Sequence, residues 1–254
     1  METVELYNSS MAARIGLLGA ELRALSLNGA ELLWTPDPAL WDGTCLVLFP
    51  VIGRVNDDAV SVGGTAYPMP MHGFALTSRF SVVAQCDNRC TLELRAGPET
   101  RRSYPYDFAL RMTYRLSGSA LQIIAEIRND GRFALPTSLG LHPGFRWPLV
   151  PGVPKGRHLL TFDETAPILY TRPVKRLIGR PVRTPAGRRV AEARRGAVRE
   201  RRAGAAFTEK PQPSLPNRGR QGGNPRRFPG HGRRHPVVAA GRRFSLHRAA
   251  ARPC

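Results

Sequence analysis

The fold class is decided by the stretch FALRMTYRL, residues Phe108 to Leu116 of this chain of 254 residues. Apolar side chains occupy every second position, which is the period of a β-strand with one buried face. A second run, LQIIAEIR from Leu121 to Arg128, repeats the alternation. Because the short turn Ser117-Gly118-Ser119 lies between the runs, we predict a β-hairpin whose two strands share an apolar side.

Further strands are indicated on the N-terminal side of this hairpin, and turn-forming residues close several of them. We predict strands at Leu22 to Leu27, closed by Asn28-Gly29; at Ala59 to Val62, closed by Gly63-Gly64; at Phe80 to Gln85; and at Thr91 to Ala96. No segment has a convincing helical period. The sequence therefore predicts an all-β protein, an antiparallel sandwich or barrel.

The charge divides the chain in two. Residues 1–170 contain 15 basic and 16 acidic side chains, whereas residues 171–254 contain 23 basic and 3 acidic ones. The last 84 residues also hold 10 Gly, 10 Pro and 21 Arg. Such a composition cannot bury enough apolar surface to offset the entropy of ordering the chain. We predict a folded part at 1–175 and a disordered basic tail at 176–254, which could bind nucleic acid only without sequence specificity and in a salt-sensitive way.

Several classes of protein are disfavoured. The acidic start METVE, residues 1–5, does not resemble a secretory signal, and no apolar run approaches the roughly 20 residues of a membrane helix. The cysteines form no C-x-x-C pair, so neither a zinc site nor a disulfide framework is expected. They are Cys45, Cys86, Cys90 and Cys254. We predict a cytoplasmic protein with reduced thiols, no membrane contact and no bound metal.

Three polar strings carry the candidate chemistry. Arg54 ends the apolar run FPVIGR at 49–54, His72 lies in MHGFA at 71–75, and His142 lies in LGLHPGF at 139–145, directly after a predicted strand. A guanidinium offers a planar fork of donors for hydroxyls or anions, and a histidine can transfer a proton near neutral pH. The plainer alternatives are a solvated arginine at a strand end and a histidine buried in the core.

In this order and spacing, the strings resemble the aldose 1-epimerase (galactose mutarotase-like) superfamily, especially its bacterial branch of uncharacterised epimerases. The resemblance runs from about Gly19 to Tyr170 and includes GAEL at 19–22, Leu33-Trp34 and YPYDF at 104–108. It implies a supersandwich of antiparallel strands with a sugar site in a cleft on its face. The implied ligand is a hexose, and the oligomeric state stays open.

The resemblance also implies a reaction and a role for each residue. Interconversion of α and β anomers requires removal of the C1 hydroxyl proton and protonation of the ring oxygen, followed by ring opening and closure. One acid and one base suffice, so no cofactor is expected. By similarity, His142 is the general acid, His72 its hydrogen-bonding companion, and Arg54 a donor to sugar hydroxyls.

Two alternatives stay open beside this function. The first is a hexose-6-phosphate 1-epimerase, which requires extra cations at the rim of the site. The candidates for these cations are Arg79, Arg101 and Arg102. The second is a non-catalytic carbohydrate-binding protein that keeps the histidines and the arginine.

The C-terminal third departs from the family pattern. The family's general base is a Glu in a Cys-Ile-Glu-Pro type string, whereas the acidic residues after Glu164 are only Glu192, Glu200 and Glu209, all in Arg-rich surroundings. Codons for residues 244–250, shifted by one nucleotide, can spell Cys-Ile-Glu-Pro. Codons for 235–238, shifted the same way, can spell Leu-Trp-Ser, which also resembles the family. We therefore predict a frameshift between about residues 170 and 180, a truncated sandwich and impaired catalysis.

Overall fold

The computed structural model describes residues 2–161, 169–174, 177–183, 190–192, 237–238 and 243–244. Strands dominate this part of the chain, and its one α-helix, α1 (Pro98–Arg101), is a single turn. Short 3-10 turns occur at Asn56–Asp58, Ala75–Thr77 and Lys155–Arg157. The predicted all-β class is confirmed.

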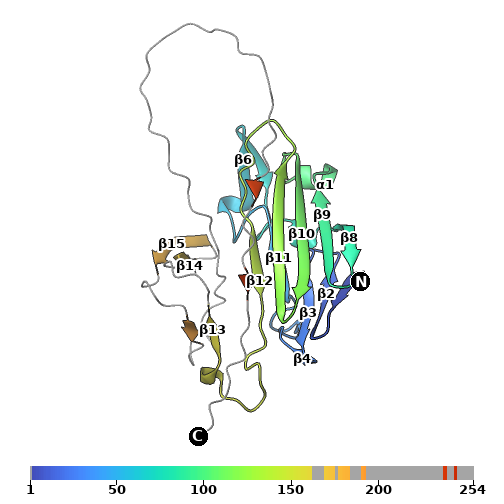
Figure 1. The fold of residues 1–254 in the computed structure, drawn as a ribbon. Coiled ribbons are helices and arrows are strands. Elements are labelled where there is room, and N and C mark those ends of the chain that lie inside the picture. The colour runs from blue at the N-terminus through green and yellow to red at the C-terminus, as the bar shows by residue number, and fades with distance from the viewer. Residues whose placement is uncertain are drawn as a thin grey trace, which may run out of the picture.

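Two antiparallel sheets form the body of the molecule. The first has the order β1-β2-β3-β4, with β1 (Thr3–Tyr7), β2 (Met11–Gly16), β3 (Leu22–Leu27) and β4 (Ala30–Glu31). The second contains β8 (Ser81–Cys86), β9 (Arg89–Arg95), β10 (Phe108–Ser117) and β11 (Ala120–Asn129), and β11 also pairs with β17 (Val237–Val238) and β18 (Arg243–Phe244). In Figure 1 the long β10–β11 hairpin stands in front of the blue strands β2 and β3.

Smaller strand pairs surround the two sheets. They are β5 (Cys45–Leu48) with β12 (Gly140–Pro143), β6 (Ala59–Val62) with β7 (Thr65–Pro68), β13 (Leu159–Thr161) with β16 (Val190–Glu192), and β14 (Leu169–Val174) with β15 (Leu177–Arg183). The pair β5–β12 joins the strand that carries His142 to the strand that leads directly into the string 49–54.

The predicted hairpin is present, with a turn one residue shorter than the Ser117-Gly118-Ser119 segment expected from the sequence. The β10–β11 ladder is antiparallel from the pair Phe108↔Asn129 to the pair Ser117↔Ala120, which leaves a two-residue turn at Gly118-Ser119. Gly118 has φ +57°, a conformation that glycine adopts without steric cost. The apolar positions of both strands therefore share one face, as the alternation indicates.

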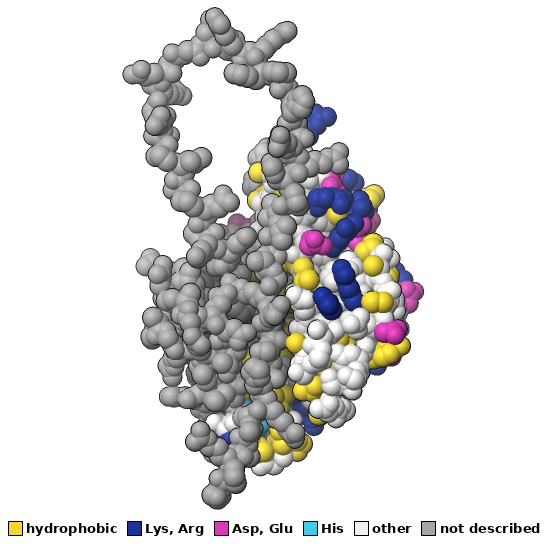
Figure 2. All heavy atoms as spheres, viewed as in Figure 1, with side chains coloured by type: hydrophobic (Ala, Val, Ile, Leu, Met, Phe, Trp, Pro, Cys, Tyr) yellow, Lys and Arg dark blue, Asp and Glu magenta, His cyan; other side chains and the backbone are white. Residues whose placement is uncertain are grey.

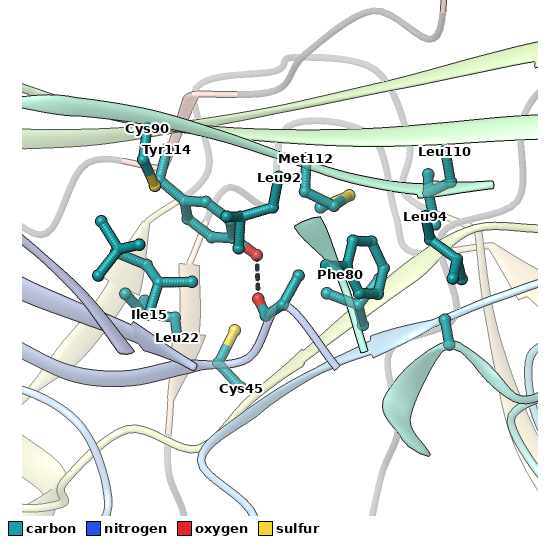
Figure 3. Close-up of a cluster of buried hydrophobic side chains, with 14 of the residues drawn as sticks. Ile15, Leu22, Cys45, Phe80, Cys90, Leu92, Leu94, Leu110, Met112 and Tyr114 are labelled. Carbon is teal, nitrogen blue, oxygen red and sulfur yellow. Dashed lines mark hydrogen bonds between the residues drawn. The ribbon is translucent and has the colours of Figure 1, made fainter. Parts of the chain in front are cut away.

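The core lies between the two sheets. Figure 3 shows Ile15 and Leu22 of the first sheet facing Leu92, Met112 and Tyr114 of the second, and all five side chains are buried. The Tyr114 hydroxyl donates a hydrogen bond to the carbonyl of Ala20, so the largest buried ring has its one polar atom satisfied. This bond ties β10 to the start of β3.

The opposite face of β10 is less exposed than the alternation suggests. Ala109 and Thr113 point away from the core, yet their exposed fractions are only 1% and 4%. The hydroxyls of Thr113 and Thr91 lie 2.8 Å apart across the β9–β10 ladder. A strand with an alternating sequence is therefore not exposed to solvent along its whole outer side.

The outer face of the second sheet carries paired charges. Figure 2 shows basic side chains next to acidic ones on the visible face of the described part. Glu93 accepts from Arg111 at 2.6 Å, and Arg128 pairs with Asp130 at 2.5 Å. The Arg128 and Asp130 side chains are 43% and 30% exposed, so this pair contributes little to the free energy of unfolding. The Glu93 side chain is only 7% exposed, and Arg95 also pairs with it at 2.6 Å, so two cations compensate its buried charge.

The predicted boundary between 175 and 176, and the predicted disorder of 176–254, fall mostly outside the described residues and stay predictions. The described fragments of that region are the short strands β15, β16, β17 and β18. Among the helices described, none has the length and apolar character needed to cross a membrane.

Candidate active site

His142 reaches the site from inside a strand. It lies in β12 opposite Leu46 of β5, so the sequence-based placement directly after a strand is wrong. The β5–β12 ladder imposes the strand period on the His-Pro-Gly string. Leu141 and Pro143, on either side of His142, line an apolar hollow between the sheets, and His142 belongs to the other face of β12.

His72 is held by a loop that is bonded to the arginine string. The His72 amide donates to the carbonyl of Gly53 at 2.8 Å, and its carbonyl accepts from the amide of Phe49 at 3.2 Å. The amide of Phe74 donates a hydrogen bond to the carbonyl of Phe49 at 3.0 Å. These bonds bring the strings 49–54 and 71–75 together, although neither forms a regular strand where they meet.

Gly73 is required for this close approach. Its φ is +75°, and a Cβ built there would lie 2.1 Å from the carbonyl oxygen of Phe49. Any side chain would therefore collide with backbone that cannot move independently. The glycine of the His-Gly-Phe string is explained by this contact rather than by chain flexibility.

The protonation state of His72 follows from its backbone contact. The amide of Gly53 donates to Nδ1 of His72 at 3.0 Å, so Nδ1 is an acceptor and the proton of the neutral ring is on Nε2. Burial lowers the pKa of His72, and the neighbouring His142 lowers it further. His72 is therefore a neutral ring that offers one N–H from Nε2.

The two histidines come together as expected from the sequence. Their ring centroids are 6.2 Å apart and the ring planes are inclined by 48°. Both rings are half-buried. Residues seventy positions apart in the chain thus share one small region, and this geometry suits a pair acting on neighbouring atoms of one ligand.

Arg54 is anchored by an acid that the sequence analysis missed. Its Nε donates to Oδ1 of Asp58 at 2.5 Å, and its Nη2 donates to Oδ2, so two of the five guanidinium N–H groups are used. This pairing raises the pKa of Arg54 and lowers the pKa of Asp58. Three N–H groups are not engaged by Asp58, and the Arg54 side chain is 41% exposed. Donation to a ligand hydroxyl is chemically feasible.

The three arginines considered for a phosphate at the rim all have acidic partners. Arg79 pairs with Glu2, Arg101 pairs with Asp107 at 2.5 Å, and Arg102 pairs with Glu99 at 3.0 Å. The side chains of all three are between 49% and 73% exposed. Each charge is already compensated on the surface, which agrees with a solvated edge.

A buried acid also supports the strand that carries the site. Glu21, of the GAEL string, accepts from the amide and the hydroxyl of Thr44 at 2.7 and 2.8 Å. The carbonyl of Thr44 accepts from the amide of Gly144 at 2.7 Å. Glu21 is 6% exposed and is also paired with Arg23 at 2.9 Å. This network fixes the start of β5 against the end of β12.

The described residues contain no cluster of three or more His, Cys, Asp or Glu side chains that could hold a metal ion. Within the same part of the chain, Cys45, Cys86 and Cys90 are free thiols. Burial raises the pKa of Cys45 to about 12, so this thiol is not a nucleophile at neutral pH.

Comparison with known proteins assigns the fold and the family. The family model for aldose 1-epimerase matches residues 2–200. Protein LacX from Lactococcus lactis subsp. lactis is 29% identical over 169 residues, which cover 64% of this chain and 56% of that protein, so the chain spans a little over half the length of the curated relatives it matches.

Solved structures show the same fold. A galactose mutarotase related enzyme from Lactobacillus acidophilus superposes with a TM-score of 0.70 at 23% identity, covering 76% of this chain and 65% of that one. A galactose mutarotase-like protein from Lactobacillus casei superposes with a TM-score of 0.62 at 30% identity, covering 68% and 60%. The fold is the galactose mutarotase-like all-β fold, and the chain belongs to the aldose 1-epimerase family.

Proposed function

We propose that this chain binds a hexose at the surface formed by Arg54, His72 and His142, and that the reaction served by this site is interconversion of the α and β anomers. The observation that carries the proposal is the convergence of the two histidine rings, 6.2 Å apart, beside the loop that ends in Arg54. Family membership supplies the class of substrate.

The chemistry assigns a different task to each side chain. His142 donates a proton to the ring oxygen while a base removes the proton from the C1 hydroxyl. The bond between C1 and the ring oxygen then breaks, and the open-chain aldehyde forms. Rotation about the C1–C2 bond and closure by the reverse transfers yield the other anomer. His72, neutral with its proton on Nε2, donates a hydrogen bond to a sugar oxygen, and Arg54 donates to hydroxyls.

The general base is the one group of this reaction that the chain lacks. The family's Glu in its Cys-Ile-Glu-Pro type string has no counterpart among these 254 residues. We therefore propose that the chain retains binding and loses most of the turnover. A purely carbohydrate-binding role is the second candidate, and the retained Arg54, His72 and His142 favour it.

The sugar is proposed to be uncharged. A phosphate needs uncompensated cations, whereas Arg79, Arg101 and Arg102 each pair with a carboxylate. The free thiols among the described cysteines agree with the cytoplasm as the proposed compartment.

Isothermal titration calorimetry with D-glucose and D-galactose tests the binding. We expect Arg54→Ala to weaken the affinity by about 10-fold or more, because a charge-assisted hydrogen bond is lost. Arg128→Ala is the matched control, since Arg128 also forms a two-pronged pair with an aspartate but lies on the outer face of β11. Equal effects of the two substitutions, or no heat of binding with either sugar, would reject the proposal.

A further inference from the structure

Trp41 is held against the site by its own backbone. It lies in the loop between β4 and β5, where its amide donates to the carbonyl of Asp37 at 2.6 Å and its carbonyl accepts from the amide of Asp37 at 3.0 Å. The indole N–H of Trp34 donates to the same carbonyl at 3.1 Å. Three hydrogen bonds thus fix the point from which the Trp41 side chain leaves the loop.

Two glycines leave the room that the Trp41 indole occupies. A Cβ at Gly43 would lie 2.8 Å from Cε2 of Trp41, and a Cβ at Gly144 would lie 2.5 Å from its Cζ3. Neither glycine has a positive φ, so backbone conformation does not explain them. Gly144 belongs to the His-Pro-Gly-Phe string, two residues after His142. Gly144 therefore leaves the space that the indole of Trp41 occupies.

The indole meets the imidazole of His142. Their ring centroids are 5.1 Å apart and the planes are inclined by 32°, a closer and flatter contact than the one between His142 and His72, at 6.2 Å and 48°. A ring in this position restricts rotation of the imidazole about its Cβ–Cγ bond.

We propose that Trp41 is a positioning residue that fixes the plane of the His142 imidazole relative to His72. This inference rests on the proposed function, because its consequence is the alignment of the proposed acid with a sugar oxygen. It accounts for two glycines, a constrained loop and a ring contact that the sequence motifs leave unexplained.

Proton NMR of the histidine side chains, in protein without sugar, tests the placement. Protons above an indole face resonate upfield, so we expect Trp41→Leu to move the ring protons of His142 downfield, and Trp41→Phe to move them less. His142→Gln assigns the signals. The matched control is Trp147→Leu, because Trp147 contacts His158 with a centroid distance of 5.3 Å and should leave His142 unchanged. Should Trp41→Leu fail to fold, Trp41→Phe decides the question.

Binding of D-galactose by the same variants tests the consequence. We expect Trp41→Leu to weaken the affinity by about 3-fold and Trp41→Phe to restore most of it. The proposal is overturned if the His142 protons move no more in the Trp41 variants than in Trp147→Leu. Unchanged affinity in a Trp41→Leu protein whose His142 protons have moved also overturns it. Absence of sugar binding by the unaltered chain would reject the proposed function, whereas the sugar-free spectra would still decide the placement.

Discussion

His72 illustrates how a hydrogen bond sets a tautomer while burial and a neighbouring histidine set a pH dependence. Its pKa in the folded protein is lower than the ordinary 6.5, first because the ring is buried and second because His142 is near. Below pH 6.5 the unfolded chain therefore binds more protons at this residue than the folded chain does. The contribution of His72 to the free energy of unfolding therefore falls as the pH drops from above 6.5 through the lowered pKa.

His72→Asn should reduce this dependence. The Asn Oδ1 can accept the bond from Gly53 in place of Nδ1, and Asn tolerates the φ of +70° found at residue 72. We expect a urea midpoint close to that of the unaltered chain at pH 7.5 and a smaller decrease on going to pH 5.5. An equal decrease in both proteins would contradict the assignment of the titrating group.

Gly73 gives a second test at the same turn. Gly73→Ala combines a positive φ with a clash against the Phe49 backbone, so we expect it to lower the free energy of unfolding by about 3 kcal/mol or more. Gly64→Ala is the control, because Gly64 has φ +83° but no atom within 4 Å of the added Cβ. It should cost only the conformational penalty, about 1–2 kcal/mol. Similar urea midpoints for the two variants would show that the clash is relieved by movement.

At the scale of elements, turn chemistry made the ends of strands β3 and β6 predictable. Asn28-Gly29 and Gly63-Gly64 each form two-residue turns in which both residues have positive φ, as the tight turns between antiparallel strands require. The strand β12 was not predictable, because its four residues Gly140–Pro143 have no alternation and pair with a strand almost a hundred positions away. The contacts of Trp41 with His142 and Gly144 depend on the same long-range pairing, and the local sequence around Trp41 does not indicate them.

The β9–β10 ladder offers a test of how a buried polar pair contributes to a sheet. Thr91 and Thr113 lie directly opposite each other, are 7% and 4% exposed, and share a hydrogen bond of 2.8 Å. Either Thr→Val substitution alone leaves a buried hydroxyl without its partner, which should cost about 1–3 kcal/mol. The double substitution should cost less than the sum of the two single ones. Additive costs in urea unfolding would show that the hydroxyls do not depend on each other.

At the scale of the molecule, two chemically different parts meet in one chain. The first 170 residues have nearly balanced charge and supply the core of both sheets, whereas the last 84 carry 23 of the 38 basic residues. The three site residues all come from the balanced part, at positions 54, 72 and 142. The proposed binding surface therefore lies wholly in the balanced part, whereas the proposed general base has no counterpart in the basic part.

This division leads to the prediction for catalysis. A positioned acid or base typically contributes roughly 10²–10⁴-fold to a rate, so the chain without its Glu should show little mutarotation of glucose or galactose above buffer by polarimetry. Correcting the proposed frameshift near residues 170–180 should restore a Glu together with the missing strands, and activity should appear.

In the corrected protein His142→Ala should remove most of the activity, because it deletes the proposed acid. Arg54→Ala should act partly through KM, because Arg54 is assigned to sugar hydroxyls rather than to proton transfer. Full activity in the uncorrected chain would refute the assignment of the base, and a folded but inactive corrected protein would favour the sugar-binding role.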